Sequence, residues 1–74
     1  MKVKVRLFAT LREGRGKEQI IDFGRNVCPQ DIFDQLNIPP NEVAILLING
    51  FNGKPDQPLK DGDTVSIFPP VGGG

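Results

Sequence analysis

The sequence lacks histidine, tryptophan and tyrosine altogether, and it contains a single cysteine among its 74 residues. Without histidine, the chain has no side chain of the type that serves most often as a general base near neutral pH and as a metal ligand. One cysteine can form neither an internal disulfide nor a thiolate cluster. We therefore expect no catalytic centre and no bound cofactor or metal in this chain.

An excess of charge of one sign and a long apolar run are missing as well. Nine lysines and arginines balance nine aspartates and glutamates, so the basic excess that nucleic-acid binding requires is absent. The longest apolar run, residues 43–48, is far too short to span a bilayer. The alternating charged and apolar residues over 1–6 are unlike a signal peptide. These features predict a soluble cytoplasmic protein with neither nucleic acid nor membrane as a partner.

The apolar residues that are present follow the pattern of one small domain. Strands are predicted where apolar residues alternate with polar ones or form a short continuous run. A short helix is predicted where they recur at helical spacing, with Pro29 at its first position and Pro39-Pro40 ending it. In order, the predicted elements are strands over 2–9 and 17–23, a helix over 29–36, and strands over 43–49 and 64–68.

This order of elements favours one main helix packed on one face of a mixed sheet. The predicted fold is α+β with a β-grasp (ubiquitin-like) arrangement, in which the first and last strands are parallel neighbours in the middle of the sheet. We expect a β-grasp domain over 1–70, followed by a flexible tail over 71–74. The strand over 43–49 is apolar on both faces, so it is either covered on both sides or keeps one face apolar for a partner.

The end of the chain combines two prolines with three glycines. Pro69-Pro70 stiffens the base of the tail, whereas Gly72, Gly73 and Gly74 lack a Cβ atom and can pass through a narrow channel. Terminal glycines are also common in frayed ends and linker scars. The sequence upstream therefore decides between an idle tail and a functional one.

Three stretches together resemble one family. They are residues 7–13 (Leu-Phe-Ala-Thr-Leu-Arg-Glu), residues 48–50 (Ile-Asn-Gly), and residues 59–71, which run from Leu-Lys-Asp-Gly-Asp to Phe-Pro-Pro-Val before the glycines. In this order they resemble the MoaD/ThiS sulfur-carrier family, in particular its molybdopterin synthase small-subunit branch (molybdopterin-converting factor subunit 1). The likeness covers the whole chain.

The resemblance implies that the chain is a carrier and not a catalyst by itself. A ubiquitin-activating-type adenylyltransferase would use ATP to adenylate the Gly74 carboxylate and convert it to a thiocarboxylate, with Gly72 and Gly73 threading into the enzyme. The loaded tail would then donate its sulfur inside a synthase large subunit or another acceptor enzyme. Thiamine-type sulfur transfer and conjugation to target lysines through Gly74 are alternatives. We expect a monomer between encounters.

Two phenylalanines predict a docking patch beside the tail. If the first and last strands are neighbours, Phe8 and Phe68 lie together on the face away from the helix, where an exposed aromatic pair favours partner binding. We expect Leu46 and Ile48 to extend this patch. It would continue into the exit of the tail, formed by Pro69, Pro70 and Val71. The alternative is that loops cover the face and the rings belong to a minor core.

Basic residues accompany the predicted patch. Lys2, Lys4 and Arg6 fall on the same strand face as Phe8, where they either frame the patch or form an ordinary solvated surface. Arg12 matches the Leu-Arg-Glu motif of the family, and a loop ion pair with Glu13 explains this dipeptide equally well.

Two other features invite a chemical interpretation. Cys28 stands before the predicted helix, where a short polar N-cap residue is expected. A helix N-terminus can activate a thiol, but we interpret this cysteine as structural. Asp61 and Asp63 flank a glycine, and two carboxylates do not fill a calcium shell. We interpret them as the turn that leads into the last strand.

Overall fold

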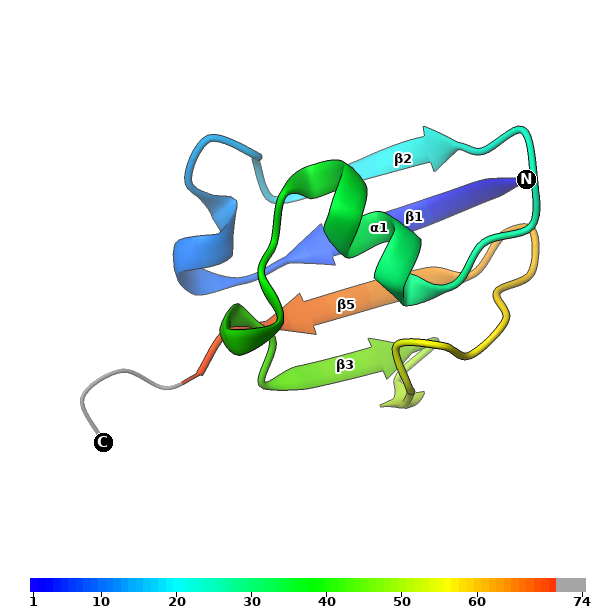
Figure 1. The fold of residues 1–74 in the computed structure, drawn as a ribbon. Helices are drawn as coiled ribbons and strands as arrows, with labels where there is room; N and C mark the ends of the chain where they lie inside the picture. Colours follow the sequence, from blue (N-terminus) through cyan, green and yellow to red (C-terminus); the bar gives the residue numbers. More distant parts are fainter. Residues whose placement is uncertain (71–74) are drawn as a thin grey trace.

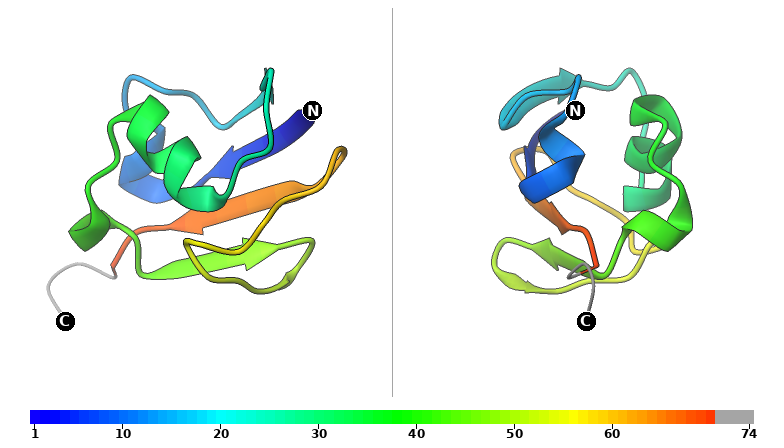
Figure 2. Two further views of the ribbon diagram at one scale, coloured as in Figure 1. Left: turned by 45° about the vertical axis from the view of Figure 1, so that its right-hand side comes forward. Right: turned by 90° about the vertical axis from the view of Figure 1, so that its left-hand side faces the viewer.

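The computed structural model describes residues 1–70, drawn in colour in Figure 1. One short α-helix lies across one face of a five-stranded sheet, and Figure 2 shows the two layers edge-on. In order, the elements are β1 (Lys2–Leu7), the 3-10 helix η1 (Ala9–Arg12), β2 (Glu18–Asp22), α1 (Pro29–Leu36), the 3-10 helix η2 (Pro40–Glu42), β3 (Ile45–Ile48), β4 (Phe51–Asn52) and β5 (Thr64–Phe68).

The sheet has the strand order β2-β1-β5-β3-β4. Strands β1 and β5 are parallel neighbours, with Val5 paired to Val65, and the other three pairs of strands are antiparallel. The first and last strands of the described chain thus lie side by side in the middle of the sheet. The predicted β-grasp fold, with one main helix on one face of a mixed sheet, is confirmed.

The core lies between the sheet and α1. Alternate residues of β1 and β5 point toward the helix because successive side chains of a strand face opposite sides. Five of them are fully buried, and Ile32 and Phe33 of the helix pack against them. Fully burying one such aliphatic side chain contributes about 1.5–3 kcal/mol. The five strand residues are Val3, Val5, Leu7, Val65 and Ile67.

Helix α1 has the predicted bounds but ends for a different reason. At its start, the Asp31 carboxylate accepts a hydrogen bond from the backbone N–H of Cys28 at 2.9 Å, which satisfies a donor that the helix leaves free. At its end, Asn37 adopts left-handed angles (φ 56°, ψ 44°). The backbone N–H of Ile38 then donates to the carbonyl oxygen of Phe33 at 2.8 Å. Asparagine tolerates this conformation, so the helix stops before the two prolines.

The second half of the sheet differs from the prediction in its details. Strand β3 begins at Ile45, and the short 3-10 helix η2 precedes it. A tight turn joins β3 to the two-residue strand β4, which the sequence analysis missed. Asn49 and Gly50 form this turn with φ values of 53° and 86°, as expected for the Asn-Gly dipeptide.

The Asp-Gly-Asp turn leads into β5, as predicted. Asp61 accepts the backbone N–H of Lys2 at 2.7 Å, and Asp63 accepts the backbone N–H of Lys60 at 2.8 Å and the side-chain amide of Asn49 at 2.9 Å. Asp61 therefore ties this turn to the start of β1, and Asp63 holds the backbone within the turn.

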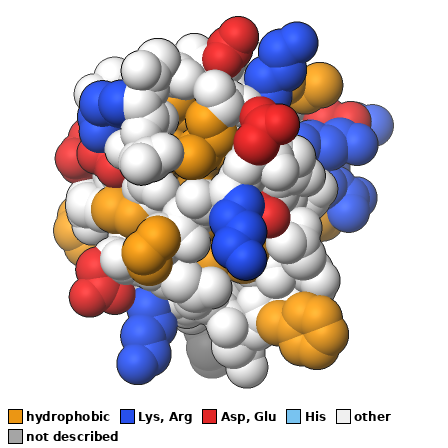
Figure 3. Space-filling model, turned by 90° about the vertical axis from the view of Figure 1, so that its right-hand side faces the viewer, with side chains coloured by type: hydrophobic (Ala, Val, Ile, Leu, Met, Phe, Trp, Pro, Cys, Tyr) orange, Lys and Arg blue, Asp and Glu red, His pale blue; other side chains and the backbone are white. Residues whose placement is uncertain are grey.

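The surface at this end of the molecule mixes charges of both signs. Figure 3 shows lysine and arginine side chains next to aspartates and glutamates, with hydrophobic groups between them. Within residues 1–70, no helix combines the length and the apolar character that a membrane crossing needs.

Candidate functional site

The rings of Phe8 and Phe68 form the centre of the candidate site. Their centroids lie 4.1 Å apart and their planes differ by 12°, so the rings are stacked. The register explains the contact, because Leu7 pairs with Ile67 in the core and the residue that follows each of them points to the other face. The predicted pairing of the two phenylalanines is confirmed.

A groove of about 400 Å³ lies against the stacked rings. Both rings are half-buried, so the groove has apolar walls that solvent can reach. The ends of β5, η1 and η2 all lie at the end of the molecule where the described chain stops (Figure 2). We call this surface the docking groove. Its lining residues are Phe8, Ala9, Thr10, Ile45, Phe68, Pro69 and Pro70.

The third strand contributes different residues from those predicted. Leu46 and Ile48 are each only 7% exposed and belong to the core. Leu46 pairs with Ile67, and Ile48 pairs with Val65, so they point toward α1 and cannot extend the patch.

The residues that extend the outer face instead are Ile45 and Leu47. Ile45 is 49% exposed and pairs with Phe68, and Leu47 pairs with Ser66. In the described part of the chain, β3 is therefore covered on the side of α1 only. Its other face is apolar and partly exposed to solvent.

The basic residues of β1 divide into two groups. Glu18 pairs with Lys4 at 3.3 Å and with Arg6 at 3.7 Å, which is typical of a solvated strand face. The guanidinium carbon of Arg6 also lies 5.4 Å from the centroid of the Phe8 ring. Arg6 therefore frames the groove, whereas Lys2 and Lys4 lie further back along the strand.

Arg12 is a component of the site that the sequence analysis did not resolve. Its guanidinium carbon lies 5.3 Å from the centroid of the Phe8 ring, and its Nε donates to the carbonyl oxygen of Leu7 at 2.7 Å. Within residues 1–70, Arg12 has no carboxylate within 4 Å, so the alternative of a loop ion pair with Glu13 is wrong.

The backbone turns sharply between Phe8 and Arg12. Ala9 has a φ of 53°, a left-handed conformation that costs roughly 1–2 kcal/mol for residues other than glycine. This turn starts η1 directly after the strand and brings Arg12 back over the preceding residues. No local sequence preference of alanine indicates such a turn.

Cys28 is the N-cap residue of α1, as predicted. Its Sγ lies 3.4 Å from the Asp31 carboxylate, and the thiol is half-buried. The backbone N–H of Cys28 lowers the pKa of Asp31, and hydrogen bonds from the Cys28 and Arg25 side chains add to the effect. This arrangement supports the structural interpretation of the cysteine.

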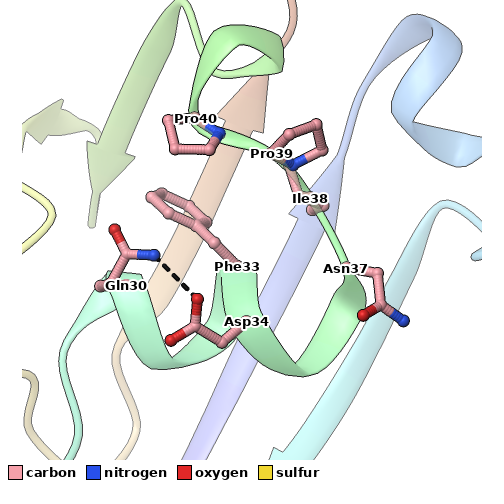
Figure 4. A pocket seen from close by; sticks show the side chains of 7 residues that line it. All are labelled: Gln30, Phe33, Asp34, Asn37, Ile38, Pro39 and Pro40. Atoms are coloured by element: carbon pink, nitrogen blue, oxygen red, sulfur yellow. Dashed lines mark hydrogen bonds between the residues drawn. The ribbon is translucent and has the colours of Figure 1, made fainter.

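A larger hollow of about 470 Å³ lies beside the end of α1 (Figure 4). Gln30 donates to Asp34 at 2.9 Å on the exposed side of the helix, and Phe33 and Ile38 belong to the core. Among residues 1–70, no lysine or arginine lines this hollow, and it lies on the helix-covered side of the sheet, away from the stacked phenylalanines. We therefore place the candidate site at the smaller docking groove.

The predicted reactive group and part of the predicted exit lie outside the described residues. These are Val71, Gly72, Gly73 and Gly74, so the groove is described only as far as Pro70.

Comparisons with known proteins place the chain among small carrier-like domains. The ThiS family model matches residues 5–74. A protein described as molybdopterin converting factor, subunit 1, from Pyrococcus furiosus has 28% identity and a TM-score of 0.77, over 96% of this chain and 99% of that one. A complex of subunits 1 and 2 of the molybdopterin-converting factor from Helicobacter pylori contains a chain with 26% identity and a TM-score of 0.67, over 100% of both chains.

The same fold occurs in SAMP1 from Haloferax volcanii, with 22% identity and a TM-score of 0.79 over 100% of both chains. None of the curated protein sequences matches this chain.

Proposed function

Because this chain belongs to the ThiS family, we propose that it is a sulfur carrier that is loaded at its C-terminal Gly74 carboxylate. The observation that supports this most directly is the stacked pair of Phe8 and Phe68, which forms an apolar groove with Pro69 and Pro70 at the base of the tail. A partner that binds this groove has the reactive end of the chain within reach.

Loading needs an activating step because a carboxylate is a poor electrophile. In the proposed reaction, a carboxylate oxygen of Gly74 attacks the α-phosphorus of ATP, and pyrophosphate leaves. A sulfur nucleophile then attacks the acyl carbon of the glycyl adenylate, and AMP leaves with the oxygen. With hydrosulfide as the nucleophile, this substitution gives the thiocarboxylate directly. With a persulfide it gives an acyl disulfide, and a thiol then breaks the S–S bond, which releases the thiocarboxylate and leaves a disulfide between the thiol and the donor. Both steps belong to a ubiquitin-activating-type adenylyltransferase, and the carrier contributes only the tail.

The length of the tail limits where this chemistry can occur. Four residues follow Pro70, and four fully extended residues span at most roughly 14 Å. The active site of a partner must therefore lie close to the surface that contacts the docking groove. A groove at the base of the tail meets this requirement, whereas the hollow beside Gln30 and Asp34 on the helix-covered side does not.

We propose molybdopterin synthesis, for the molybdenum or tungsten cofactor, as the destination of the sulfur. The likeness to the Helicobacter pylori protein, whose solved structure is a complex with subunit 2, supports a synthase large subunit as the second partner. The Pyrococcus furiosus protein gives the same indication. The test is to supply the thiocarboxylated chain and the large subunit with a pterin precursor and to measure dithiolene formation. Dithiolene formation with the large subunit would assign the chain to molybdopterin synthesis. Sulfur transfer to a thiamine-type acceptor only would assign it to thiamine synthesis instead.

Deletion of Gly73 and Gly74 separates a carrier from a plain binding module. We expect the truncated chain to keep its fold and its binding to the partner and to lose all sulfur transfer. Unchanged transfer by the truncated chain would contradict the proposal. Chains joined through Gly74 to lysines of target proteins in a cell lysate would identify a protein modifier instead.

A further inference from the structure

The guanidinium group of Arg12 is held in place at the edge of the docking groove. Its Nε donates to the carbonyl oxygen of Leu7 at 2.7 Å, and its guanidinium carbon lies over the Phe8 ring, 5.3 Å from the ring centroid. An arginine fixed in this way has already lost much of the side-chain freedom that binding would otherwise cost.

The charge of Arg12 is not neutralised within residues 1–70. Arg6, the other cation at the Phe8 ring, has a carboxylate oxygen of Glu18 at 3.7 Å. Arg12 has no carboxylate within 4 Å among these residues, and its two terminal nitrogens donate none of the hydrogen bonds that the described residues form. Its side chain is exposed. Among residues 1–70, the terminal nitrogens of Arg12 therefore have no partner, and its exposed guanidinium can donate two parallel hydrogen bonds to a ligand.

Among residues 1–70, the docking groove beside this guanidinium has no acidic lining residue, and its walls are aromatic, aliphatic and proline side chains with one threonine. A ligand that fits both parts must carry negative charge next to apolar groups. A guanidinium fork matches a carboxylate through two parallel hydrogen bonds. The surface of a partner protein offers this combination, with apolar side chains next to an aspartate or glutamate. At protein interfaces, aromatic and arginine residues contribute much of the binding energy.

We infer that the docking groove binds a protein partner that places an aspartate or glutamate against Arg12 and apolar side chains in the groove. This inference rests on the proposed function, because the partner concerned is the adenylyltransferase that loads Gly74. The ion pair selects the partner and speeds the encounter, since charges at the rim of an interface act mainly on association rate and on its dependence on salt. Arg12 is thus a residue of partner specificity, and the sulfur chemistry does not involve it.

The test is to measure binding of the purified adenylyltransferase from the same organism, without nucleotide, over a series of salt concentrations. Arg12→Gln removes the charge, and Arg12→Lys keeps it. We expect the Gln variant to bind about tenfold more weakly at low salt and to show a shallower salt dependence. The Lys variant should keep the slope of the wild-type chain. The control is Lys60→Gln, which removes the charge of an exposed lysine in the turn at the other end of β5. This variant should have the affinity and the salt dependence of the wild-type chain.

Three results would overturn the inference. One is wild-type affinity and salt dependence in the Arg12→Gln variant. Another is an effect that appears only when ATP is present, which would assign the arginine to a nucleotide phosphate. The third is equal loss of salt dependence in the Gln and Lys variants, which would count against a charge contact. Thermal unfolding of each variant checks that the fold is intact.

Loading at saturating enzyme separates this inference from the proposed function. With the partner in excess, the Arg12→Gln variant should still gain sulfur at Gly74. If the wild-type chain gains none, the sulfur-carrier proposal fails, whatever the variant does in the binding experiment.

Discussion

Phe8 and Phe68 stack at a centroid distance of 4.1 Å, although they lie 60 positions apart in the sequence. The parallel pairing of β1 and β5 brings them together. The strand that begins the domain therefore supplies half of the aromatic surface next to the strand that leads into the tail. Under the proposed function, a partner bound to this surface would therefore lie next to the strand that leads into residues 71–74.

Truncation of an aromatic ring in the docking groove should weaken partner binding. We expect Phe8→Ala to lower affinity for the adenylyltransferase roughly 30-fold, as for a hot-spot residue worth about 2 kcal/mol. Loss of the stack should cost only about 0.5–1.5 kcal/mol of stability. Phe51→Ala is the matched control, because Phe51 is 77% exposed on β4 and does not line the groove. Equal effects of the two substitutions on affinity would contradict the assignment.

The two faces of β3 should respond in opposite ways to substitution. Leu46 is buried, so Leu46→Ala should lower the free energy of unfolding by about 2–5 kcal/mol. Ile45→Ser, on the exposed face beside Phe68, should change stability much less and weaken partner binding. Urea denaturation and binding measurements on both variants check this division. Stronger binding loss in a folded Leu46→Ala variant than in Ile45→Ser would show that the faces are assigned wrongly.

Arg15 fastens the loop after Phe8 to the end of α1. Its guanidinium donates to the carbonyl oxygens of Leu36, Leu11 and Asn37 at 2.9, 3.2 and 3.1 Å. We expect Arg15→Ala to lower the free energy of unfolding by about 1–3 kcal/mol, because these carbonyls lose a charged donor.

The control for the Arg15 experiment is Lys17→Ala, because Lys17 is an exposed cation two positions away from Arg15. Urea denaturation curves of the two variants should therefore separate clearly. Coinciding midpoints would mean that the three carbonyls are satisfied equally well by water.

The Asp31 carboxylate should make stability depend on acid pH. Its pKa lies below the ordinary value of 3.8 because the carboxylate accepts the backbone N–H of Cys28. The folded state therefore favours the charged form, and the stabilisation is fully present above the unfolded pKa. It is lost as the pH falls through the folded pKa. The difference in unfolding free energy between the wild-type chain and Asp31→Asn should shrink with acidification below about pH 4. A difference that is constant with pH would exclude this contribution.

The sequence predicted the parts of the fold that follow from local periodicity. Alternation within β1 and β5 placed Phe8 and Phe68 on the outer face, and helical spacing after Pro29 gave the bounds of α1. The order of these elements then indicated the β-grasp arrangement. The family resemblance found in residues 7–13 and 59–71 is confirmed by the ThiS model and by the solved structures.

The parts that the sequence did not predict depend on contacts between distant residues. Apolar residues occupy both faces of β3, so only its register with β5 shows that Leu46 points inward and Ile45 outward. The position of Arg12 depends on the left-handed turn at Ala9, which alanine does not favour by itself. Tertiary packing fixes both features, and no window of sequence contains that information.

The central claim is that the Gly74 carboxylate is the group that carries sulfur. The most direct measurement is the mass of the C-terminal peptide after the chain is incubated with the adenylyltransferase, ATP and a sulfur donor. We predict the gain of one oxygen replaced by sulfur at Gly74, no gain without ATP, and no gain in a chain that lacks Gly73 and Gly74. An unchanged mass of the wild-type chain, with an enzyme that binds it and hydrolyses ATP, would contradict the account.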